Sequence, residues 1–189
     1  MIRLIAEAYL ALSATLKALT FRPNWQAGLD VSMTGFWHSF FAIIPSILLV
    51  GFSIISFNHA GFPIEVFRVW LVFALSWLIF PGAAAVTTII LGVRQSFVPW
   101  VVLHNWGVVW LYALTTFYWT LLTAGLITLE VLQVLFFMHL YFRMLVHWRI
   151  AYVTLGLPTI TSALAAAVPI VVLEITRLVV YQAFPASGG

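Results

Sequence analysis

Long apolar runs alternate with short polar connectors along the whole chain. About 20 apolar residues suffice to cross the hydrocarbon core of a bilayer as a helix. Runs of at least this length fall at about 35–57, 64–92, 98–122, 126–148 and 158–181. The pattern predicts an all-α, polytopic membrane bundle of five transmembrane helices, in a single membrane domain over residues 1–189.

The third and fourth runs predict a helical hairpin. Read as one helix, Phe97–Trp148 would be about 75 Å long, more than twice the hydrocarbon thickness. The chain must therefore fold back, and Thr123–Gly125 is the weakest helix-forming segment near its middle. This turn places Trp119 and Glu130 near one membrane face. Helix four is then expected to end near Trp148, followed by a turn over residues 152–157.

The first span needs a start signal, and either Asp30 or Ser32 is suited to cap its N-terminus. Pro45, Pro81 and Pro169 fall inside predicted spans. Prolines free backbone carbonyls and kink helices. We expect them to shape the bundle, and the alternative is that they help to build a site near mid-membrane.

Residues 1–20 predict a helix lying in the membrane interface. Glu7 and Lys17 mark a narrow polar stripe, while apolar residues such as Ile5, Tyr9 and Leu16 recur at helical spacing beside it. The alternative is that this helix simply extends the bundle.

Basic residues predict the orientation. With five spans, one side of the membrane receives Lys17, Arg22, Arg94, Arg143 and Arg149, and the other receives only Arg68 and Arg177. Because the cytoplasmic side carries the excess of Lys and Arg, the N-terminus should be cytoplasmic and the C-terminus outside. We expect the bacterial inner membrane.

Composition supports this class and excludes others. Hydrophobic residues make up 64% of the chain and charged residues only 7%, against about 25% charged in soluble domains. The net charge of +3 comes from scattered side chains, so no basic cluster indicates nucleic-acid binding. The absence of cysteine excludes thiolate zinc sites, cysteine-ligated iron–sulfur clusters, c-type haem and disulfides.

One set of ionisable residues is predicted at the outer face. Glu65–Arg68 and Glu174–Arg177 are spaced i,i+3, which favours local pairs at helix ends. Glu130 has no basic residue within a turn of it on its own helix. If it is buried, it should be protonated or bind a cation or proton, whereas at the interface it would simply reach water. The alternative for all five residues is a shared outer pocket.

A second set lies toward the cytoplasmic side. His139, Arg143 and His147 recur every four residues on one face of helix four, and His104 on helix three is expected at about the depth of Arg143. His104 and His139 are candidate axial ligands of haem b, with Arg143 near its propionates. The alternatives are a quinone or other ligand site, or hydrogen-bonded interior histidines with Arg143 and His147 at lipid phosphates.

The chain has no familiar catalytic motif, such as H-E-x-x-H, G-x-S-x-G, a P-loop or a dinucleotide fingerprint. We therefore expect a non-catalytic scaffold, assembly or accessory subunit of a membrane complex. Its partners would be the lipid bilayer and other membrane subunits or copies of itself. The alternatives are a haem b- or quinone-binding redox subunit using His104 and His139, and a small-solute or proton-coupled carrier using Glu130.

Overall fold

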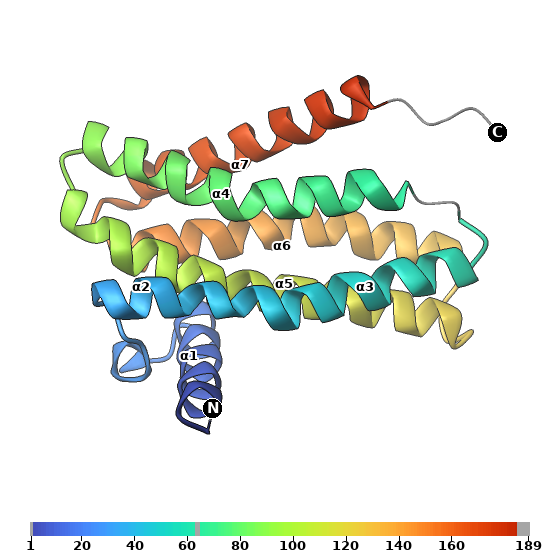
Figure 1. Ribbon diagram of the computed structural model, residues 1–189, viewed down its shortest axis with the longest axis horizontal. Coiled ribbons are helices and arrows are strands. Elements are labelled where there is room, and N and C mark those ends of the chain that lie inside the picture. The colour runs from blue at the N-terminus through green and yellow to red at the C-terminus, as the bar shows by residue number, and fades with distance from the viewer. Residues whose placement is uncertain (1, 63–64, 185–189) are drawn as a thin grey trace.

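The computed structural model describes residues 2–62 and 65–184, which form helices and connections without any strand (Figure 1). The α-helices are α1 (Ile2–Leu19), α2 (Met33–Ser39), α3 (Ile43–His59), α4 (Val66–Ile90), α5 (Phe97–Thr123), α6 (Leu129–Leu155) and α7 (Thr159–Ala183). Short 3₁₀ helices are η1 (Trp25–Gly28), η2 (Phe40–Ala42) and η3 (Arg94–Ser96). The predicted all-helical class is confirmed.

Five helical segments within the described ranges are long and apolar enough to cross a membrane. They are Met33–His59, Val66–Ile90, Arg94–Thr123, Leu129–Leu155 and Thr159–Ala183. Their number agrees with the sequence prediction, and most ends agree to within a few residues. Residues 1 and 64, which the predicted first helix and second span include, lie outside the described residues.

The first span is not one continuous α-helix. Ser32 caps α2, its hydroxyl accepting a hydrogen bond from the Gly35 N–H at 3.2 Å, which confirms one of the two predicted caps. The α-helix tightens to η2 before α3 begins. Pro45 explains this position, because its ring clashes with the carbonyl four residues earlier, on Phe41 within η2.

The predicted hairpin turn is present between α5 and α6, where Gly125 has φ 69°. The predicted end of the fourth span is wrong, since α6 continues past Trp148 to Leu155. Gly156 then adopts φ 66° and Pro158 precedes α7. A left-handed glycine followed by proline is a typical helix stop, so the turn begins later than residue 152.

Helix α1 lies crosswise to the other helices (Figure 1). Its small side chains Ala11, Ala14, Thr15 and Ala18 are buried. The Trp110 indole N–H on α5 donates to the Leu12 carbonyl oxygen at 3.2 Å, and Arg149 Nε on α6 donates to the Ala18 carbonyl oxygen at 2.9 Å. The helix therefore packs on the bundle through the face that carries its small side chains. Its position in a membrane interface stays a prediction.

The long helices form two groups. Helix α5 packs against α3 and α6, while α4 packs mainly against α7. The groups meet closely near η3, where Phe80 on α4 lies 5.7 Å from Trp100 on α5, between ring centres. Toward the other end, the C-terminal half of α7 slopes away from α6 (Figure 1). A cavity lies between the two groups.

Candidate functional site

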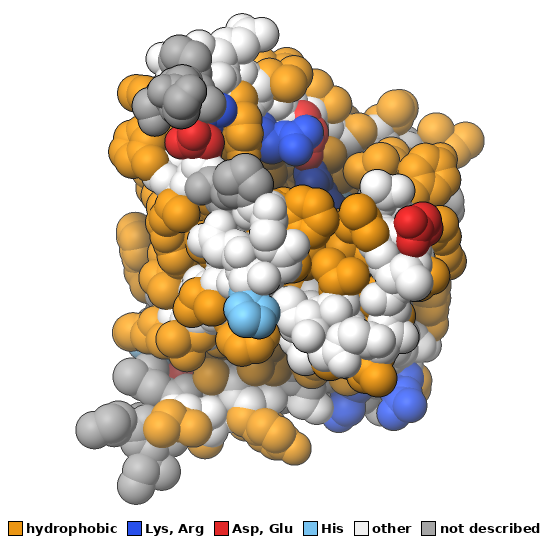
Figure 2. Space-filling view, turned by 90° about the vertical axis from the view of Figure 1, so that its right-hand side faces the viewer, with side chains coloured by type: hydrophobic (Ala, Val, Ile, Leu, Met, Phe, Trp, Pro, Cys, Tyr) orange, Lys and Arg blue, Asp and Glu red, His pale blue; other side chains and the backbone are white. Residues whose placement is uncertain are grey.

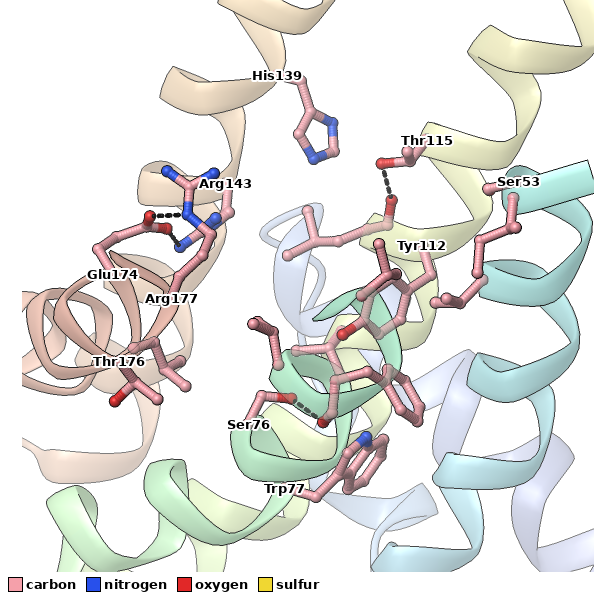
Figure 3. A pocket seen from close by; sticks show the side chains of 18 of the residues that line it. Ser53, Ser76, Trp77, Tyr112, Thr115, His139, Arg143, Glu174, Thr176 and Arg177 are labelled. Atoms are coloured by element: carbon pink, nitrogen blue, oxygen red, sulfur yellow. Dashed lines mark hydrogen bonds and ion pairs between the residues drawn. The ribbon is translucent and has the colours of Figure 1, made fainter. Parts of the chain in front are cut away.

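A cavity of about 400 Å³ lies between the two helix groups. This volume falls within the range of about 300–1,000 Å³ that is typical of small-molecule sites. Most of its wall is apolar, and includes Val50, Ile54, Val69, Phe73, Val108 and Leu173. Figure 3 shows polar side chains from α4, α5, α6 and α7 around the same space.

An ion-paired triad of side chains forms one wall of this cavity. Glu174 on α7 accepts a hydrogen bond from Arg143 on α6 at 2.6 Å, and its other carboxylate oxygen forms an ion pair with Arg177 Nε at 2.9 Å (Figure 3). The predicted Glu174–Arg177 pair at i,i+3 is thus present. The prediction that Arg143 and Glu174 lie toward opposite membrane faces is wrong, because each sits near the middle of its helix and α6 packs against α7.

The triad carries an excess positive charge. Among the described residues that line the cavity, Glu174 is the only acidic one, whereas two are basic, Arg143 and Arg177. The Arg177 side chain is 56% exposed and the Arg143 side chain 29% exposed. Figure 2, which faces the end of the bundle that carries the α3–α4 connection, shows basic and acidic side chains next to one another in a recess among hydrophobic ones. Because these side chains are partly exposed, the triad is reachable from outside the protein.

A second polar group of the cavity lies deeper, between α4, α5 and α6. The His104 ring stacks on Phe80 with ring centres 3.2 Å apart, and the His147 ring lies 5.2 Å from it. His147 Nδ1 donates to the Arg143 carbonyl oxygen at 2.8 Å, so this nitrogen carries a proton. His104 Nδ1 and Trp77 Nε1 are buried and have no hydrogen-bond partner among the described residues.

His139 lies apart from the His104–His147 pair. It precedes His147 by two helical turns on α6, about 12 Å of helix rise, and its ring packs edge-on against Tyr118 at 5.9 Å. Its Nδ1 is also buried without a partner among the described residues. Two axial ligands of one haem must lie at the same level and face each other. The structure brings the His104 ring against His147, whereas the His139 ring packs on Tyr118.

The predicted outer pocket of five residues is not assembled. Glu65 precedes α4 in a non-helical conformation, so the i,i+3 geometry that favoured a pair with Arg68 does not apply. Arg68 is buried, and its guanidinium carbon lies 5.3 Å from the centre of the Tyr181 ring. Glu130 is exposed in the first turn of α6, beyond its Thr128 cap, and does not line the cavity.

The described residues contain no group of three His, Cys, Asp or Glu side chains that could hold a metal ion. Sequence reasoning also missed hydroxyl-bearing residues that line the cavity, namely Ser53, Ser76, Tyr112, Thr115 and Thr176. Small hydroxyls in apolar helices commonly bond their own backbone, as Ser76 and Thr115 do here. For that reason the sequence carries little signal for them.

No protein-family model, curated protein or solved structure matches this chain.

Proposed function

We propose that the chain is an integral membrane protein of the bacterial inner membrane, with its N-terminus in the cytoplasm and its C-terminus outside. Five helices of sufficient length and apolar character support this proposal. So does the outward face of α6, with the exposed large side chains Phe137, Met138, Leu140, Tyr141 and Phe142. Such side chains suit lipid tails or the apolar faces of partner subunits.

The orientation is tested with reporters fused after Gly189. A reporter that is active only outside the cytoplasm should be active, and one that is active only in the cytoplasm should be silent. The same two reporters fused after Arg94, in the connection between α4 and α5, should give the reverse pattern. Cytoplasmic activity at Gly189 would contradict the proposed orientation.

Within the membrane, we propose a non-catalytic accessory or binding subunit whose cavity holds a small, largely apolar molecule. The observation that carries this proposal is the cavity of about 400 Å³ with apolar walls and a few converging polar groups, which is the usual form of a ligand site. An ion pair near the middle of two membrane helices supports it further, because charged groups at that depth commonly mark a functional site.

The binding proposal is tested by filling the cavity. Val108→Trp adds a large side chain to the cavity wall, and we expect it to lower the amount of small molecule that co-purifies in mild detergent by about tenfold or more. Val86→Trp is the matched control, because Val86 is exposed on α4 and does not line the cavity. Native mass spectrometry measures the bound mass. Equal retention by the wild type and by Val108→Trp would contradict the proposal.

A second candidate is a quinone-binding redox subunit. It is favoured by His104 Nδ1 and Trp77 Nε1, two buried nitrogens without partners that line the same cavity. As N–H donors they would suit the carbonyl oxygens of a quinone. A quinone that co-purifies with the wild type and is lost in His104→Ala would support this candidate, and quinone-free protein of full stability would contradict it.

A further inference from the structure

The charge balance of the cavity indicates what kind of molecule it takes. Glu174 shares its two carboxylate oxygens between Arg143 and Arg177. Among the described lining residues this leaves one formal positive charge in excess, with the histidines neutral. A charge without a counter-charge is costly in apolar surroundings. An occupant that carries a negative charge would offset it.

The cavity also has hydrogen-bond donors left to satisfy. Each guanidinium has five N–H groups and uses only part of them on Glu174. Trp77 is 7% exposed, and its indole N–H can only donate. The labelled side chains of the triad and Trp77 lie around one shared space, on different sides of it (Figure 3). An occupant therefore needs acceptor oxygens at the triad and gains from another near Trp77.

We infer that the cavity binds an amphipathic organic anion, with its acidic group at Arg143 and Arg177 and its apolar body along Phe73 and Val108 toward Trp77. This inference rests on the proposed binding function and names the ligand class. A quinone would supply acceptors but no charge, so the excess charge of the triad favours the acid. The acidic group can come from a free fatty acid or from the head group of a membrane lipid.

Binding to the detergent-purified protein, measured by native mass spectrometry, separates these cases. The probes are palmitate, its uncharged methyl ester and dioleoyl phosphatidylglycerol. We expect palmitate to bind at least about tenfold more tightly than the ester, because charge-assisted hydrogen bonds to guanidinium are the stronger kind. Binding of phosphatidylglycerol without palmitate would assign the same chemistry to a membrane lipid.

Two cavity variants should change the affinity for the anion in opposite directions. Arg177→Gln removes a donor and the excess charge, and should weaken binding about tenfold. Glu174→Gln removes the competing carboxylate and raises the excess charge, and should tighten it. Arg94→Gln is the control, since it removes an exposed positive charge in η3, outside the cavity, and should leave binding unchanged. A merely structural role of the triad would weaken binding in both cavity variants.

The outcomes separate this inference from the function on which it rests. Equal binding of palmitate and its ester, or weaker binding by Glu174→Gln, would overturn the anion assignment and leave a binding site for neutral molecules. Failure of all three probes to bind, together with no effect of Val108→Trp on co-purified material, would overturn the binding function itself.

Discussion

Replacing Gly35 by alanine is expected to destabilise the protein by about 2 kcal/mol or more. A Cβ at residue 35 would overlap the Asp30 carbonyl oxygen and lie 2.7 Å from the Asp30 Cγ. That segment cannot shift freely, because the Asp30 carboxylate accepts a hydrogen bond from the Ser32 N–H at 2.9 Å and Ser32 in turn caps α2. The new side chain would therefore disrupt the start of the first span. Thermal unfolding in detergent should show a midpoint lower by about 4–8 °C.

Gly82→Ala is the matched control for this experiment. Gly82 lies inside α4, and a Cβ there would meet no described atom within 4 Å. Because alanine is the better helix former, this variant should be neutral or slightly more stable. If Gly35→Ala unfolded at the same temperature as Gly82→Ala, the tight approach of α2 to Asp30 would be refuted.

The span pattern could be predicted from the sequence because local signals set it. Hydropathy over some 20 residues depends only on neighbouring residues, and the turn at Gly125 lies where helix propensity is lowest. The same kind of signal was available at Gly156, whose left-handed conformation ends α6. The end predicted near Trp148 is wrong because the polar and aromatic residues before Gly156 continue the helix to Leu155.

The cavity could be predicted only in part, because it depends on how separate helices face each other. The i,i+3 spacing of Glu174 and Arg177 is local, and it correctly predicted their pair. The contact of Arg143 with Glu174 depends on the axial register of α6 against α7. The sequence does not fix this register, so the depths predicted for Arg143 and Glu174 are wrong. The contact of His104 with His147, rather than with His139, depends in the same way on the axial register of α5 against α6.

Replacing Glu174 by leucine is expected to cost far more stability than replacing Arg143 by methionine. Glu174→Leu leaves two guanidinium groups without the carboxylate that separates them, whereas Arg143→Met leaves a balanced Glu174–Arg177 pair. Breaking a fully buried ion pair from one side costs about 3–5 kcal/mol. The side chains here are about one-third exposed, so we expect about 2 kcal/mol for Glu174→Leu and less than about 1 kcal/mol for Arg143→Met.

The double variant Arg143→Met/Glu174→Leu completes the thermodynamic cycle. It restores the net charge of the wild-type triad, because only Arg177 remains, so it should unfold at a higher temperature than Glu174→Leu alone. A coupling energy of about 1 kcal/mol or more between the two positions is expected for groups in direct contact. Strictly additive effects in the thermal midpoints would mean that Arg143 and Glu174 do not interact, and the charged wall of the cavity would not exist as described.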